Sequence, residues 1–333
     1  MLCSIMSRYR RQTRLMKFFP SLIVPITVLL LNSLAALPSF ATGKAESSAP
    51  PEVHPEKVWY AICMEVMQGS DRVDFANQAL SLNPHSVLAF NCRGTAYSYI
   101  KQNDKAIADF NAAIGIDPKQ VFSYYNRGQA YASLKQYDKA IADFTRTIEL
   151  DPNRTDVYIS RGVAYSELKL DDKAIADYTR VIGLNPHDGT AYFNRGYIYF
   201  DHQQYDKAIA DYTEMMRMAP EDTLLCFAAL QRGMAYAELK QYDKAIADYT
   251  LSLAMNPLEI NPYIYRGIAY QELKQYDKAL AEFNQLIRLD PKDGGAFSLR
   301  ATVYEAMGNK QQAQADYQQA CQMGITEACS KSR

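Results

Sequence analysis

The hydrophobic and polar residues of this chain alternate with a helical period over most of its length. From Val87 to Glu327, aromatic and aliphatic residues recur three and four positions apart, with charged residues between them. Side chains with this spacing share one face of an α-helix. Asp or Asn followed by Pro, as at Pro118 and Pro152, ends most of the second helices and turns the chain. The pattern predicts a succession of paired amphipathic helices, which is an all-α fold.

Small residues mark a constant step along this pattern. Gly94 and Gly128 lie 34 residues apart, and the step is kept except for 37 residues between Gly196 and Gly233. Glycine costs about 1 kcal/mol relative to Ala inside a helix, so its recurrence needs a structural reason. We predict a structural repeat core in which two helix backbones approach closely and aromatic residues fill the space around the contact. The core residues are Gly94, Gly128, Gly162, Gly196, Gly233, Gly267, Ala106, Ala140, Ala174, Ala208, Ala245 and Ala279.

The step divides residues 87–327 into seven units of two helices each. Their predicted bounds are 87–120, 121–154, 155–188, 189–225, 226–259, 260–293 and 294–327. Positions within a unit are numbered 1 to 34 from Val87, and the numbering restarts at Cys226 after three extra residues, which we expect to lengthen the next helix by nearly a turn. One helix pair cannot bury both of its apolar faces, so neighbouring units must stack into a solenoid.

The ends of the chain differ from the repeated part. Residues 1–41 combine a basic start, an apolar run and small residues before Ala41, which predicts a secretory signal peptide cleaved after Ala41. An uncleaved membrane anchor is the alternative interpretation. Residues 42–55 are rich in Pro, Ser and Ala and predict a flexible linker. We interpret residues 56–86 as a degenerate N-terminal helical cap and residues 328–333 as a C-terminal tail.

Two segments carry a family resemblance. Residues 126–131 read Asn-Arg-Gly-Gln-Ala-Tyr and residues 137–144 read Tyr-Asp-Lys-Ala-Ile-Ala-Asp-Phe, within a 34-residue period. In these residues the chain resembles the tetratricopeptide repeat (TPR) proteins of the bacterial exported type. The resemblance implies a right-handed α-solenoid of stacked helix-turn-helix units. The chain departs from the family pattern at Ala229, at Ile325, and at position 7, where Arg replaces the usual Leu in every unit.

The TPR resemblance also implies where a partner would bind. First helices of such units line a concave groove, and positions 2, 5, 9, 12 and 13 face it. The partner-binding residues predicted on this basis are Tyr125, Ile159, Val163, Phe193, Tyr197, Phe200, Leu230, Met234, Ile264 and Ile268. Apolar residues at these positions suit a partner helix or an extended peptide with hydrophobic anchors. The alternative is that they only pack helix against helix.

Charged residues recur with the same step. Arg stands at position 7 of every unit, Asp or Glu at position 23, and Asp at position 18 of the first six units. Because a catalytic site occurs once and a scaffold feature occurs in every copy, we interpret these rows as structural. We hypothesise an Arg–carboxylate ladder between helices, and position-18 aspartates that favour helix starts through the helix dipole. The alternative for the ladder is two solvated faces.

The cysteines are sparse and form no Cys-x2-Cys motif. The spacing of Cys321 and Cys329 would let the last helix be joined to the turn or helix after it, as in the Sel1-like relatives of TPR proteins. An exported chain permits such a disulfide. The alternative is that Cys321 fills an apolar position and Cys329 is a thiol in the tail. A second link, between Cys63 and Cys92, is conceivable.

Composition and motifs argue against several functions. The first 41 residues hold five basic residues and no acidic one, and the whole chain has 36 Lys and Arg against 37 Asp and Glu. The remainder is therefore acidic, whereas a nucleic-acid partner requires a basic face. The sequence contains no zinc-protease, P-loop or serine-hydrolase motif and only four scattered His residues. We expect no enzyme activity, no cofactor, no metal ion and no nucleic-acid partner.

The leading hypothesis is an exported TPR scaffold that binds a protein or peptide in its concave groove to assemble or localise a cell-envelope complex. It would be periplasmic or secreted, with no integral membrane segment after signal cleavage. Anchoring to the inner membrane by an uncleaved N-terminal segment is the alternative location. The alternative functions are a structural, self-associating TPR oligomer, and an envelope enzyme or glycan-processing factor with an unrecognised site.

Overall fold

The computed structural model describes residues 70–218 and 224–332, and all regular structure in them is helical. The first helices of the units are α5 (Val87–Tyr99), α7 (Val121–Ser133), α9 (Thr155–Glu167), α11 (Gly189–Asp201), α13 (Leu225–Glu238), α15 (Ile260–Glu272) and α17 (Gly294–Ala306). The second helices are α6 (Asn103–Ile116), α8 (Tyr137–Leu150), α10 (Asp171–Leu184), α12 (Tyr205–Met218), α14 (Tyr242–Met255), α16 (Tyr276–Leu289) and α18 (Lys310–Gln322). Helix α4 (Ser70–Leu82) precedes them and α19 (Thr326–Lys331) follows them.

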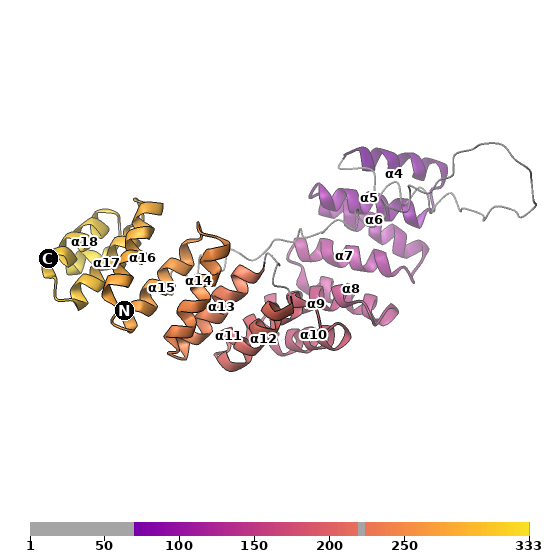
Figure 1. Ribbon diagram of the computed structural model, residues 1–333. Helices are drawn as coiled ribbons and strands as arrows, with labels where there is room; N and C mark the ends of the chain where they lie inside the picture. Colours follow the sequence, from indigo (N-terminus) through magenta and orange to yellow (C-terminus); the bar gives the residue numbers. More distant parts are fainter. Residues whose placement is uncertain (1–69, 219–223, 333) are drawn as a thin grey trace, which may run out of the picture.

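These helices stack in chain order. Each first helix packs on the second helix of its own unit, and that second helix packs on the first helix of the next unit. Figure 1 shows the resulting curved array, from α4 and α5 at one end, past α9 and α10, to α17 and α18 at the other. The prediction of an all-α, right-handed solenoid is confirmed.

Helix boundaries follow from local chemistry. The aspartates at position 18, such as Asp138, lie in the first turn of a second helix, as predicted. Second helices end where an Asp or Asn adopts an extended conformation before Pro, as Asp117 does with φ −133°. The turn inside each unit contains a residue in the left-handed backbone conformation at position 15, which the sequence pattern did not predict. These residues are Lys101, Lys135, Lys169, Gln203, Lys240, Lys274 and Gly308.

The recurring glycine at position 8 makes room for an aromatic ring. A Cβ atom built on Gly128 would lie 2.7 Å from Cε1 of Phe144, the aromatic residue at position 24 of the same unit. The ring therefore lies directly against the glycine. At Gly233 such a Cβ would lie 2.7 Å from Cε1 of Tyr249 and 3.2 Å from the backbone oxygen of Ala245, so the facing helix backbone is close there as well. The ring is the nearest neighbour of the glycine, whereas the sequence pattern had placed it around the backbone contact. The alanines at position 20, such as Ala140, are fully buried.

The three extra residues before the fifth unit do not lengthen its first helix by nearly a turn. Helix α13 has 14 residues, whereas each other first helix has 13. A single residue of the insertion therefore joins the helix. Leu225, at its start, is buried, and so is Ala229, which replaces the aromatic residue usual at position 4.

The two ends of the described chain are closed by extra helices. At the amino end, α4 packs on α5, and Phe75 lies against buried Ala76 and Cys92. The predicted signal peptide, the cleavage point after Ala41, the linker 42–55 and the first part of the cap lie outside the described residues. At the carboxyl end, α19 takes in the first residues of the predicted tail and packs on α18.

Candidate partner-binding site

The first helices form the inner layer of the curved stack. First helices of adjacent units, from α5 and α7 to α13 and α15, contact one another more extensively than the second helices do. In a curved array, the layer whose elements lie closer together is on the inside of the bend. The inner surface is therefore built from the first helices, as the TPR resemblance implied.

An arginine in each first helix holds it to the second helix. Nε and Nη2 of Arg161 both donate to Asp177, at 2.8 Å each, and Asp177 is only 5% exposed. The hydrogen bond to Asp177 raises the pKa of Arg161 above its ordinary value, so the pair stays ionised. Such salt bridges join Arg93–Asp109, Arg127–Asp143, Arg161–Asp177, Arg195–Asp211, Arg232–Asp248, Arg266–Glu282 and Arg300–Asp316. The hypothesis of an Arg–carboxylate ladder is confirmed.

The same arginines also reach the preceding unit, which sequence reasoning missed. Nη1 of Arg161 donates to Oγ1 of Thr145 in α8, at 3.0 Å. Position 25 is Asn or Thr in every unit that supplies such a contact. This recurrence could have indicated the contact from the sequence alone. The guanidinium of Arg161 also lies over the rings of Tyr158 and Tyr165. Each arginine thus fixes both the helix pair and the joint between units.

Six of the ten predicted groove residues keep accessible surface. Tyr125, Ile159, Val163, Phe193 and Ile268 are half-buried on the inner helices. Tyr197 is 37% exposed on α11. These side chains belong to units two to four and unit six, and they give the middle of the inner surface an apolar and aromatic character.

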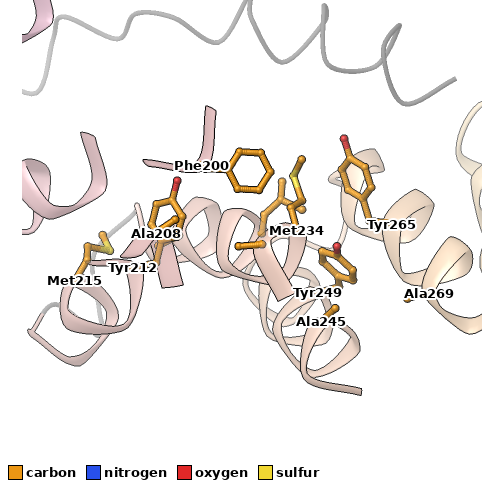
Figure 2. Packing of buried hydrophobic residues seen from close by; sticks show 12 residues of the cluster. Phe200, Ala208, Tyr212, Met215, Met234, Ala245, Tyr249, Tyr265 and Ala269 are labelled. Atoms are coloured by element: carbon orange, nitrogen blue, oxygen red, sulfur yellow. The ribbon is translucent and has the colours of Figure 1, made fainter. Parts of the chain in front are cut away.

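The other four predicted groove residues are packing residues. Phe200, Leu230, Met234 and Ile264 are 7%, 5%, 6% and 2% exposed. Phe200, Leu230 and Met234 belong to one cluster that runs from α11 to α15, and Figure 2 shows Phe200 and Met234 between Tyr212 and Tyr265. For these four residues the burial favours the alternative interpretation, in which the side chains pack helix against helix.

Polar side-chain contacts join the first helices to one another near the amino end. Oγ of Ser123 donates to Oδ1 of Asn91 at 2.8 Å, which joins α7 to α5. Nε2 of Gln129 donates to the hydroxyls of Tyr125 and Ser160, which joins α7 to α9. The packing of the first helices near the amino end therefore includes hydrogen bonds between side chains, and the one between Ser123 and Asn91 is fully buried.

A buried tyrosine lies in the apolar middle of the stack. Tyr212 is fully buried beneath α11, and its hydroxyl has no hydrogen-bond partner among the described residues. Burial raises its pKa well above the ordinary value. The side chain acts there as a large apolar group.

The structure joins Cys321 and Cys329 in a disulfide, as one of the two interpretations of their spacing predicted. The bond ties α18 to α19. Cys92 is also disulfide-bonded, and Cys63, its predicted partner, lies outside the described residues. Cys226 is half-buried, and burial raises the pKa of its thiol.

Within residues 70–218 and 224–332, no group of three or more His, Cys, Asp or Glu side chains is arranged to hold a metal ion. In the same part of the chain, no helix combines the length and the apolar character needed to cross a bilayer.

Family models identify the repeat directly. Models described as tetratricopeptide repeat match residues 91–120, 121–154, 171–223, 228–257, 261–293 and 295–323. Together these matches cover well over half of the chain, and the chain belongs to the TPR family. Members of this family are typically non-catalytic scaffolds for protein–protein interaction. A search of curated proteins finds no match.

Solved structures share the architecture. The C-terminal part of a TPR repeat-containing protein from Cytophaga hutchinsonii is 19% identical, with a TM-score of 0.63, over 72% of this chain and 98% of that one. A TPR protein from Parabacteroides merdae is 18% identical, with a TM-score of 0.54, over 74% and 97%. The Cut9–Hcn1 hetero-tetramer of the APC/C gives 17% identity and a TM-score of 0.53 over 70% of this chain, and the match spans 46% of that chain. At these identities the likeness shows the fold.

Proposed function

We propose that this chain is an exported scaffold that holds a protein or peptide partner on its inner surface and so assembles or localises a cell-envelope complex. The observation that carries the proposal is the exposure of Tyr197 on the inner helix α11, with half-buried Phe193 on the same helix and half-buried Val163 at the equivalent position of α9. Accessible apolar side chains on a concave surface are typical of sites for peptides and helices.

The repeat itself does not require these side chains. The core positions 8 and 20 are small in every unit, whereas position 9 varies freely along the array. Its residues are Thr95, Gln129, Val163, Tyr197, Met234, Ile268 and Thr302. A position that changes from polar to aromatic while the fold stays the same is available for recognition of a partner.

Two features support export. Residues 1–41 have the layout of a secretory signal, and the disulfide between Cys321 and Cys329 suits an oxidising compartment. N-terminal sequencing of the protein purified from the envelope fraction tests this part of the proposal. A mature chain that starts at Thr42 is expected, whereas an intact amino terminus in the membrane fraction would instead favour the anchored form.

A pull-down from envelope extract tests partner binding. The test variant is Val163→Ser/Tyr197→Ala, which changes accessible inner residues. The matched control is Ile116→Ala/Leu170→Ala, which changes an exposed residue of the second helix α6 and the exposed residue just before the second helix α10. We expect the partner to be lost with the inner variant and kept with the control. Equal retention by both variants would exclude the inner surface as the binding site.

A second candidate function, self-association, is favoured by a patch on α14 and the turn after it. Leu251, Met255 and Leu258 are 38%, 40% and 76% exposed there. The other units carry polar residues at the positions of Leu251 and Leu258, with Ala112 as the exception. The residues equivalent to Leu251 are Ala112, Arg146, Arg180, Glu214, Gln285 and Gln319. The residues equivalent to Leu258 are Lys119, Asn153, His187, Glu221, Lys292 and Thr326. Light scattering of the wild type and of the Leu251→Ala/Leu258→Ala variant decides the matter. A mass of one chain for the wild type would rule this candidate out.

A further inference from the structure

A small polar cavity lies on the inner surface between the first two units. It has a volume of about 80 Å³ and is lined by Thr95 and Ser98 of α5, by Asn126, Gln129 and Ser133 of α7, and by the ring of Phe110. Ser133 is exposed and the other polar lining residues are half-buried, so the cavity is reached from the inner surface. This volume exceeds the roughly 10–15 Å³ of accessible volume that one water molecule needs.

Two polar atoms of this cavity have no partner within the described residues. They are Oγ of Ser98 and Nδ2 of Asn126, and both are buried. The neighbouring polar groups are already engaged, because Oγ1 of Thr95 donates to the Asn91 carbonyl oxygen and Nε2 of Gln129 donates to Tyr125. A buried polar group without a partner is costly. The cavity therefore presents one amide donor and one hydroxyl, and both require a partner.

The fourth unit provides an internal comparison. Ser166 and Asn194 occupy the positions of Ser98 and Asn126 at the joint between the third and fourth units, but Tyr178 replaces Phe110 beneath them. Neither Ser166 nor Asn194 has an unpartnered buried side-chain atom there. The difference between the two joints at the ring position is one hydroxyl group. Phenylalanine at position 24 of the first unit thus leaves room where tyrosine carries an oxygen.

We propose that this cavity is a subsite for a serine or threonine side chain of a bound peptide. A hydroxyl of the peptide accepts a hydrogen bond from Nδ2 of Asn126 and donates one to Oγ of Ser98, which satisfies both atoms. A carboxylate fits less well, because the cavity lining contains no cationic side chain. This inference rests on the proposed function, and it adds that the peptide carries Ser or Thr near one end and apolar residues towards the units that contain Val163 and Tyr197.

A phage-displayed library of random peptides, selected on the purified wild-type chain, tests the inference. We expect the enriched peptides to share a Ser or Thr at a fixed distance from apolar residues. Replacing that residue by Ala in a synthetic peptide should weaken binding about tenfold, because two buried polar atoms lose their partner. Titration calorimetry measures the change.

The matched variant is Phe110→Tyr, which copies the natural residue of the third unit. Its hydroxyl should fill the cavity, so the selected peptides lose affinity about tenfold and the Ser-to-Ala change no longer matters. Circular dichroism and the thermal midpoint verify that the fold is kept. Val163→Ser/Tyr197→Ala serves as the second variant, and it should weaken binding while the Ser or Thr preference persists.

The outcomes separate this inference from the proposed function. Peptides that bind through apolar residues, show no Ser or Thr preference and ignore Phe110→Tyr would overturn the subsite, which then holds only water. In that case the proposed function stands. If no peptide is enriched on the wild type, the subsite is overturned, and the pull-down from envelope extract decides the proposed function separately.

Discussion

Gly128 lies beneath the ring of Phe144, and the other glycines at position 8 lie in the same way beneath the ring at position 24. The space for a side chain at these glycines is already occupied, although glycine is a poor helix former. The opposite holds at Gly115 and Gly183 in second helices, where a Cβ would meet nothing within 4 Å. The same residue type is therefore required at one helical position and dispensable at another.

We expect Gly128→Ala to destabilise the chain by about 1–3 kcal/mol, because the ring of Phe144 must move out of a packed site. Gly115→Ala is the matched control and should stabilise by about 0.5–1 kcal/mol through helix propensity. Thermal unfolding followed by circular dichroism measures both. A shift of the midpoint in the same direction for both variants would contradict the view that position 8 requires glycine because the aromatic ring occupies the space of its side chain.

Position 15 offers a second test at this scale. Lys135 adopts φ +58°, and Gly308 occupies the equivalent position of the last unit with φ +78°. A left-handed conformation strains any residue with a Cβ but not glycine. We expect Lys135→Gly to stabilise the chain by about 0.5–1 kcal/mol and Gly308→Lys to destabilise it by a similar amount. Urea titration of the two variants verifies the opposite signs.

At the scale of elements, the arginine ladder couples helices that the apolar pattern alone would only bring near one another. Arg161 ties α9 to α10 through Asp177 and to α8 through Thr145. One helix pair is held by fewer hydrogen bonds, because Arg266 of α15 donates a single one to Glu282 of α16 and its Nε has no partner in the described chain. The longer Glu side chain replaces the Asp found in the other units, so the paired contact is not formed.

Arg161→Leu should destabilise the chain by about 3 kcal/mol, because the nearly buried carboxylate of Asp177 loses its counter-charge. The double variant Arg161→Leu/Asp177→Leu should recover most of this loss, since no charge then stays buried. Partner binding by the folded protein should be unaffected, as the pair faces the neighbouring helices. A double variant no more stable than the single one would mean that the arginine acts through its packing.

The carboxyl-terminal helix α19 is held by a covalent and an ionic contact. Cys329 is bonded to Cys321, and Nζ of Lys331 lies 2.9 Å from a carboxylate oxygen of Glu305. The hydrogen bond from Lys331, followed by that from Tyr317, lowers the pKa of Glu305 below its ordinary value. Both contacts fix a short helix that covers buried Ala320 and Tyr317 at the end of the array.

Reduction of the disulfide should loosen this end and leave the rest of the array unchanged. We expect amide exchange in α19 to become faster under reductant, with α7 as the internal control. A link of this loop length is worth about 2–3 kcal/mol in the chain-entropy estimate. Intact-mass measurement with and without reductant verifies the bond itself, and two unmodified thiols in the oxidised protein would contradict it.

At the scale of the whole molecule, the stack is held together by contacts between neighbours. Extensive contacts join helices of the same unit or of adjacent units. In such an array, stability is approximately a sum of terms for each unit and each joint. The curvature places the first helices on the inside, so side chains of different units form one inner surface.

Coupling between substitutions should therefore depend on distance along the array. We expect Gly128→Ala and Gly267→Ala, in separated units, to add within about 0.5 kcal/mol. Gly128→Ala and Gly162→Ala, in adjacent units, should depart from additivity by more, because they share the joint between α8 and α9. Double-mutant cycles on the unfolding free energy measure both pairs. Strong coupling between the separated units would contradict the nearest-neighbour description.

The candidate site shows the limit of what positions in a repeat can predict. Position 9 was expected to face the groove in every unit, and Tyr197 does keep exposed surface, whereas Met234 is buried. Both residues occupy the same place on their helices. Met234 packs in one cluster with Phe200 and Tyr265, whereas Tyr197 is not a member of that cluster and keeps 37% of its surface exposed.

The sequence by itself determined the helices, the unit length and the arginine–carboxylate pairs, because each depends on spacing along the chain that recurs in every unit. Only the tertiary structure decided that the glycines receive aromatic rings, that Arg161 also binds Thr145, and which inner residues stay accessible. These outcomes depend on how the side chains of neighbouring helices pack against one another. This packing differs between units because residue size differs at equivalent positions, as with Phe110 and Tyr178 at position 24.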